Sequence, residues 1–142
     1  MESTPFPITF SNSVSRARDD NSPIVALESA VITHGLPYPE NLNLARDLEQ
    51  DVSAEQATPA TIALLDGKIH VGLTPAQLER IATATDALKV SRRDFGFVLA
   101  RGVPGGTTVA GTLHVAQRAG IRVFATGGIG GVHRNAPFDI SA

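Results

Sequence analysis

Two mainly apolar runs mark the chain, and each leads into a segment that contains glycine. "PIVALESAVITHG" covers residues 23–35 and is rich in Val, Ile and Ala, and "IRVFATGG" covers residues 121–128. Strands that are buried on both faces of a parallel sheet have this composition. We therefore predict two buried strands, at 24–33 and 121–125, with a glycine loop directly after the second.

Helical spacing of apolar residues follows in three places. "PENLNLARDLEQDVSAEQ" (39–56) repeats apolar residues every four positions, which predicts an amphipathic helix. "TPAQLERIATAT" (74–85) opens with Thr74 as N-cap and Gln77 three residues later, a capping box with proline at the first helical position. "GGTTVAGTLHVAQRAG" (105–120) predicts a small-residue helix that opens on a diglycine.

Two further segments predict short strands. "PATIALLDGKIHVGL" (59–73) places two apolar stretches around Asp66-Gly67, which indicates a β-hairpin. "LKVSRRDFGFVLARG" (88–102) indicates a strand, a polar turn and a short helix. Alternating strands and helices predict an α/β fold with a largely parallel or mixed sheet, in which ligands bind beyond the carboxyl ends of the strands. We expect a loosely ordered leader at 1–22, in which a short helix is compatible with the sequence, and one domain at 23–142.

Composition excludes several classes of function. The formal net charge is −2, and ten arginines and two lysines are scattered rather than clustered, so no basic surface for nucleic acid or anionic membrane is expected. The absence of cysteine excludes disulfides, thiolate metal sites and a cysteine nucleophile. No apolar run approaches the roughly 20 residues that span a bilayer, and the opening segment does not have the pattern of a secretory signal. We expect a cytoplasmic protein, with an organellar location left open.

Glu28 stands inside the first apolar run. A buried carboxylate is costly to keep charged, so it should be paired or hold its proton. One interpretation is a general acid. The other is a structural glutamate that is capped by a backbone amide or by Arg92 or Arg93.

Lys89, Arg92 and Arg93 stand within five residues at the end of a predicted strand. Three cations at a turn indicate an anion site, most simply for phosphate, although a solvated charged turn has the same pattern. "GGTTVAG" (105–111) could bind phosphate at a helix N-terminus, but a glycine turn followed by a threonine cap explains it equally well.

The last segment, "ATGGIGGVHRNAPFDISA", combines a glycine loop with His133 and Asp139. Glycines of this kind allow the backbone to turn tightly or to approach a ligand. Histidine and aspartate act as proton carrier and as ligand of a hard metal ion. A loop histidine without a functional role is the alternative.

In their order along the chain, "VALESAVITHGLPYPENL", "PATIAL", "VGLT", "KVSRRDF", "GGTTVAGT" and "VFATGGIGGVHR…FDISA" resemble the pseudouridine-5′-phosphate glycosidase family, also called indigoidine synthase A-like proteins. The resemblance runs from about Pro23 to Ala142 and corresponds to the N-terminal portion of family members only.

This resemblance implies an enzyme that reversibly cleaves the C–C glycosidic bond of pseudouridine 5′-phosphate, giving uracil and ribose 5-phosphate. The family opens the ribose ring and holds its C1 as an imine on a lysine, which makes the bond breakable. A divalent metal ion, usually Mn²⁺, assists, and family members assemble as homotrimers.

The resemblance also assigns roles to individual residues. It implies a catalytic site, a substrate site and a metal ligand: Glu28 as proton donor with His133 in the active-site loop; Lys89, Val109, Thr126, Ser141 and Ala142 at the substrate; and Asp139 at the metal ion.

Family members are about twice as long, and their imine-forming lysine lies beyond Ala142. Lys68 and Lys89 do not match it. Two classes of function therefore stay open: part of an enzyme that is inactive alone, and a non-catalytic remnant that binds a sugar phosphate.

Overall fold

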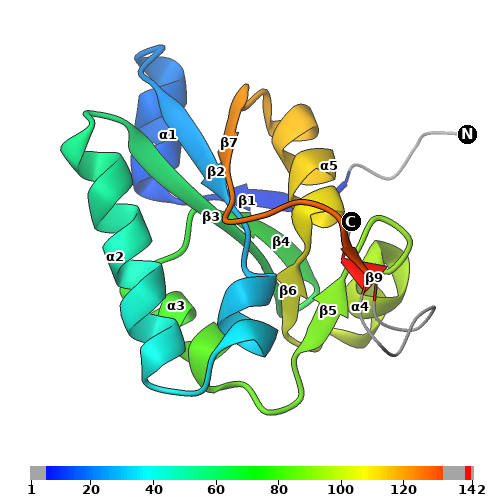
Figure 1. Ribbon diagram of the computed structural model, residues 1–142. Helices are drawn as coiled ribbons and strands as arrows, with labels where there is room; N and C mark the ends of the chain where they lie inside the picture. The colour runs from blue at the N-terminus through cyan, green and yellow to red at the C-terminus, as the bar shows by residue number, and fades with distance from the viewer. Residues whose placement is uncertain (1–5, 133–139, 142) are drawn as a thin grey trace, which may run out of the picture.

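The computed structural model describes residues 6–132 and 140–141, and seven strands in this part of the chain form one mixed sheet (Figure 1). The order of the main path is β1-β4-β3-β2-β7, and β6 joins β3 to β5. The strands are β1 (Ile8–Phe10), β2 (Ile24–Leu27), β3 (Thr58–Leu65), β4 (Lys68–Val71), β5 (Leu88–Val90), β6 (Gly105–Thr107) and β7 (Val123–Ala125), and a separate ribbon pairs β8 (Gly131–Val132) with β9 (Ile140–Ser141). The predicted α/β class with a mixed sheet is confirmed.

Helices cover both faces of this sheet. One face carries α1 (Asn12–Asp19), α4 (Phe95–Arg101) and α5 (Val109–Ala119), and the other carries the π-helix η1 (Val31–Gly35), α2 (Glu40–Ala54) and α3 (Pro75–Thr83). The predicted capping box of α3 is present. No helix among the residues described is both long and apolar enough to cross a bilayer.

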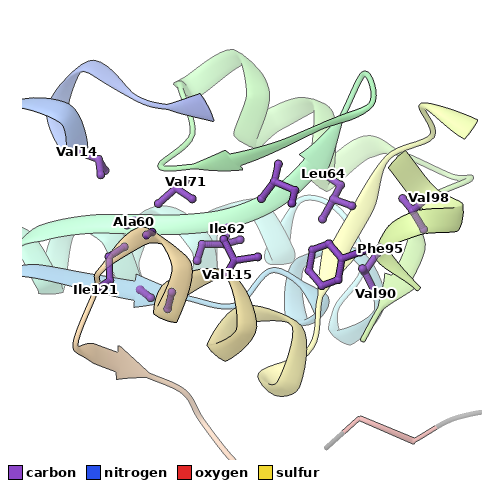
Figure 2. Packing of buried hydrophobic residues seen from close by; sticks show 14 residues of the cluster. Val14, Ala60, Ile62, Leu64, Val71, Val90, Phe95, Val98, Val115 and Ile121 are labelled. Carbon is purple, nitrogen blue, oxygen red and sulfur yellow. The ribbon is translucent and has the colours of Figure 1, made fainter. Parts of the chain in front are cut away.

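The central strand β3 divides the core into two parts. Its alternate residues Ala60, Ile62 and Leu64 face one layer of helices, as Figure 2 shows, and Ala63 and Leu65 face the other. This alternation follows from the two-residue repeat of a strand. The predicted hairpin is confirmed, because Asp66 and Gly67 take positive φ angles of 52° and 70° and β4 returns antiparallel to β3.

Two strands, β2 and β6, pair with the same edge of β3 and meet there with their carboxyl ends. β2 runs parallel to β3 and pairs with residues 58–61, while β6 runs antiparallel and pairs with Ala63 and Leu64. Because β2 and β6 run toward each other, their carboxyl ends meet beside Ile62. β7 is parallel to β2 and β5 is parallel to β6, so four strand ends converge at the middle of the sheet.

The first apolar run forms a shorter strand than predicted. β2 ends at Leu27, and the chain turns into a π-helix from Val31 instead of continuing as a strand to residue 33. Ser29 causes this change, because its backbone N–H and its hydroxyl bind to β6 and β3 and take the chain off the strand path.

The prediction that the strand at 121–125 is buried on both faces is wrong for the described residues. β7 pairs with β2 on one side only, and Val123 is 56% exposed. The diglycine also differs from expectation, since Gly105 and Gly106 form β6 and the helix begins only at Val109. Both glycines lie against packed atoms that leave no room for a side chain.

The prediction that the leader at 1–22 is loosely ordered is wrong for residues 6–22, although the short helix it allows is present as α1. β1 pairs in parallel with β4, and Val14 of α1 is fully buried. The Phe6 ring lies 5.6 Å from the rings of both Phe95 and His114, measured between centroids, and this contact anchors the segment to α4 and α5. The alternating Phe6, Ile8 and Phe10 were the signal of a strand.

Gly106 allows a test of the packing at the strand junction. A Cβ at this position would meet the Thr33 hydroxyl and would lie 2.9 Å from the backbone oxygen of Ser29. Overpacking of this kind typically costs 1–3 kcal/mol, so we expect Gly106→Ala to lower the free energy of unfolding by about 2 kcal/mol in urea titrations. Gly96→Ala in α4 is the matched control, because no atom lies within 4 Å of its Cβ. Equal effects of the two variants would contradict the packing described.

Glu49 gives the fold a pH dependence. Its carboxylate accepts a hydrogen bond from Thr61 Oγ1 at 2.6 Å, yet burial outweighs this bond and raises the pKa of Glu49 above 4.5. The folded state therefore binds this proton more tightly than the unfolded state, and stability falls as the pH rises from 4.5 through the folded pKa. We expect Glu49→Gln, which keeps an acceptor for Thr61, to raise the melting temperature at pH 7 but not at pH 4. A gain of the same size at both pH values would contradict this cause.

Candidate functional site

The four converging strand ends form the centre of the candidate site. Glu28 follows β2 and Thr126 follows β7, so the two residues come from neighbouring parallel strands. From the opposite direction, β5 ends at Val90, and α5 begins at Val109, two residues after β6 ends. Ligands of α/β proteins bind at such carboxyl ends, and here two sets of ends face each other.

Glu28 and Thr126 are joined although 98 residues separate them. The Thr126 hydroxyl donates to Glu28 Oε1 over 2.6 Å, and Glu28 is half-buried. The hydroxyl also accepts the N–H of Gly128 at 3.3 Å, which ties the start of the glycine loop to the carboxylate. The described partner of Glu28 is thus a threonine, rather than the backbone amide or the Arg92 or Arg93 that the structural interpretation expected.

A cavity of about 440 Å³ adjoins this pair. Its lining is mostly apolar, with Leu27 and Val31 from the first run and Leu44 and Leu48 from α2. Glu28 and Thr126 contribute its side-chain polar groups. A cavity of this size with few polar groups is typical of a site for a small molecule.

Buried hydroxyls position the strand ends. Ser29 Oγ donates to the backbone oxygen of Ile62 at 2.5 Å, and Thr107 Oγ1 donates to the same oxygen at 2.8 Å. In return, Ser29 Oγ accepts the Thr107 N–H at 2.8 Å, and Thr112 Oγ1 lies 2.8 Å from Thr107 Oγ1. Ser29 therefore fixes the residue that precedes it, Glu28. Sequence reasoning missed this cluster, although a serine inside an apolar run was a signal.

Lys89 lies half-buried in β5, directly beside Gly106 in the parallel register. Gly106 in turn packs against Thr33 of η1, so Lys89, β6 and η1 lie together. Arg92 and Arg93 are exposed on the following turn, where Arg93 Nε lies 3.7 Å from Asp94 Oδ1. Among the predicted cations, Lys89 is the one held within the sheet.

Val109 is buried at the first position of α5, where Thr108 caps the helix by accepting the Gly111 N–H at 3.2 Å. Thr108 Oγ1 also lies 3.0 Å from Ser91 Oγ at the end of β5. The threonine cap that one interpretation of "GGTTVAG" expects is therefore present, but the glycines before it lie in β6 rather than in a turn. The backbone of Val109 lies beside the end of β5.

The π-helix η1 places two further residues near the candidate site, Thr33 and His34, which the sequence analysis did not identify. Thr33 Oγ1 and His34 Nδ1 lie 2.7 Å apart, and His34 is exposed. π-helices are rare and often occur at functional sites. The signal was "THG", a hydroxyl and an imidazole directly after a buried strand.

Three predicted site residues, His133, Asp139 and Ala142, lie outside the described residues. Ser141 is described through its backbone only, in β9 opposite Gly131. Within the described part, no three His, Asp or Glu side chains lie close enough together to hold a metal ion. The described residues therefore do not by themselves fit a manganese site. The expected Mn²⁺ site depends on Asp139, which lies outside them.

Comparison with known proteins gives one family. Its model, described as indigoidine synthase A like protein, matches residues 13–142. The pseudouridine-5′-phosphate glycosidase 1 of Rhizobium johnstonii is 54% identical over 138 residues, which is 96% of this chain and 44% of that protein. The pseudouridine-5′-phosphate glycosidase of Herpetosiphon aurantiacus is 58% identical over 131 residues, which is 91% of this chain and 43% of that protein.

Solved structures give the same result. The prealnumycin C-glycosynthase AlnA, crystallised with ribulose 5-phosphate, has a TM-score of 0.79 and 44% identity over 95% of this chain and 44% of its own. An indigoidine synthase A-like protein from Thermotoga maritima has a TM-score of 0.79 and 33% identity over 99% of this chain and 46% of its own.

The chain spans less than half the length of these relatives. The matched stretch includes both strands whose ends carry Glu28 and Thr126, and it extends over nearly the whole chain. The chain therefore belongs to the family of indigoidine synthase A-like proteins, as its motifs predict.

Proposed function

We propose that this chain forms the N-terminal part of a pseudouridine-5′-phosphate glycosidase, which reversibly cleaves pseudouridine 5′-phosphate into uracil and ribose 5-phosphate. The observation that carries the proposal is the 2.6 Å hydrogen bond from Thr126 to Glu28 beside a largely apolar cavity. The names of relatives support the substrate, and the ribulose 5-phosphate in AlnA supports a sugar phosphate as ligand.

Glu28 is proposed as the proton donor. When the C–C bond breaks, its electron pair stays on the ring carbon of uracil, which must then accept a proton. A carboxylic acid that adjoins a largely apolar cavity can deliver that proton to a substrate bound there. Thr126 acts as a positioning residue, since its hydroxyl fixes the Oε1 side of the carboxyl group.

Substrate binding is assigned to Lys89, Val109, Thr126 and the Ser141–Ala142 stretch. Lys89 lies in β5 and Val109 at the start of α5, and the carboxyl ends of β5 and β6 face the end of β2, after which Glu28 follows. This placement supports the assignment. His133 is proposed as a further catalytic group. Mn²⁺ is proposed as a cofactor with Asp139 as ligand, where it would stabilise negative charge on the substrate. Assembly as a homotrimer and a cytoplasmic location are proposed as well.

The imine-forming lysine is proposed to come from the part that relatives carry beyond the matched stretch. Lys68 is exposed at the hairpin turn, and Lys89 is assigned to the substrate. The 142-residue chain alone is therefore proposed to be inactive.

The first test compares this chain with a chimaera in which it is continued by the C-terminal part of the Rhizobium johnstonii relative. With pseudouridine 5′-phosphate and Mn²⁺, we expect the chimaera to release uracil and the chain alone to release none, because loss of a covalent catalyst costs orders of magnitude in rate. Comparable rates for both would contradict the proposal. An inactive chimaera that still binds ribose 5-phosphate would favour the alternative, a sugar-phosphate-binding remnant.

The second test concerns the roles of Glu28 and Thr126 in the same chimaera. We expect Glu28→Gln to lower kcat by about 10²–10⁴-fold without lowering the melting temperature, as removal of a general acid does. Thr126→Val should lower kcat while Thr126→Ser, which keeps the hydroxyl, restores most of it. A loss of activity in Glu28→Gln that merely follows a loss of folded protein would assign Glu28 to structure instead.

A further inference from the structure

An apolar groove lies between α2 and β7, on the sheet face that carries α2 and α3. Its volume is about 370 Å³, its apolar lining includes Val25, Leu27, Leu48, Val52, Val123 and Ala125, and the exposed residues Asp51 and Glu55 border it. We refer to it as the α2–β7 groove. It borders the site cavity, because Leu27, Leu48 and Ala125 line both.

Helix α2 carries more apolar surface than its contact with β3 uses. Leu42 and Ala45 form one apolar stripe of α2, which is buried in the core. Leu44, Leu48 and Val52 recur every four residues and form a second, half-buried stripe on the side of the groove. A helix with two such stripes is typical of one packed between two neighbours.

Strand β7 also carries apolar surface that its described contacts do not cover. Phe124 packs against the core on the α5 side, whereas Val123 and Ala125 line the groove. In the part of the chain that the structure describes, β7 pairs with β2 alone, as Figure 1 shows for the orange strand beside β2. Parallel strands normally have both faces covered by helices. On this face α2 covers β3, whereas Val25 of β2 is only half-buried and Val123 and Ala125 of β7 are exposed.

We propose that the α2–β7 groove binds an amphipathic helix from the C-terminal part of the family polypeptide. The relatives carry more than half of their length beyond the stretch that matches this chain, which supplies such a segment. The chemistry of the groove requires an apolar stripe of that helix, flanked by a basic residue that faces Asp51 and Glu55. The proposal does not depend on the catalytic proposal, because it concerns binding alone.

The test uses a chimaera of this chain with the C-terminal part of the Herpetosiphon aurantiacus relative and a protease site at the junction. After cleavage, we expect the two pieces to co-elute in size-exclusion chromatography. Hydrogen exchange of amides in α2 and β7 should be slower in the complex than in this chain alone. The proposal would be overturned if the two cleaved pieces without substitutions eluted separately. It would also be overturned if hydrogen exchange in α2 and β7 were equally fast in the complex and in this chain alone.

Matched variants locate the contact. Val123→Lys in the groove is expected to weaken association at least tenfold, and Asp51→Lys at its rim several-fold. The controls are Leu113→Lys, an exposed apolar site on α5, and Glu79→Lys, an exposed charge reversal on α3, which should change affinity less than twofold. Circular dichroism of each variant verifies folding. Equal losses in variants and controls would overturn the proposal, as would self-association of this chain through the groove with no gain from the C-terminal part.

Discussion

The backbone oxygen of Ile62 is the point on which the central part of the structure depends. It lies on the edge of β3 between the last residue that pairs with β2 and the first that pairs with β6, so no regular strand partner reaches it. Two hydroxyls, from Ser29 and Thr107, supply its hydrogen bonds. A buried carbonyl without a partner costs about 1–3 kcal/mol, and among described residues no buried polar side-chain atom lacks a partner.

This arrangement lets two strands end at the same place. Because hydroxyls replace strand hydrogen bonds at Ile62, β2 can stop and turn into η1, and β6 can stop and turn into α5. The carboxyl ends of β2 and β7 then face those of β5 and β6. A uniformly parallel sheet would bring such ends together along a single edge only, whereas here the site is enclosed from two directions.

The sequence predicted what depends on local pattern and missed what depends on distant contacts. The hairpin at Asp66-Gly67 and the capping box at Thr74 were predictable, because each is determined within a few residues. The end of β2 at Leu27 was not, since Ser29 interrupts the strand by binding Thr107, 78 residues away. The sequence marks Glu28 as a carboxylate within an apolar run, but not its partner Thr126, which lies 98 residues further on.

The exposed side of β7 adjoins the candidate site. Thr126 directly follows β7, and Ala125 lines both the site cavity and the α2–β7 groove. Any segment that packs on this strand therefore restricts the residue that holds the Glu28 carboxyl group. An edge strand paired on one side has few contacts to keep it in place, so the position of Thr126, and through it of the Glu28 carboxyl group, depends on what covers β7.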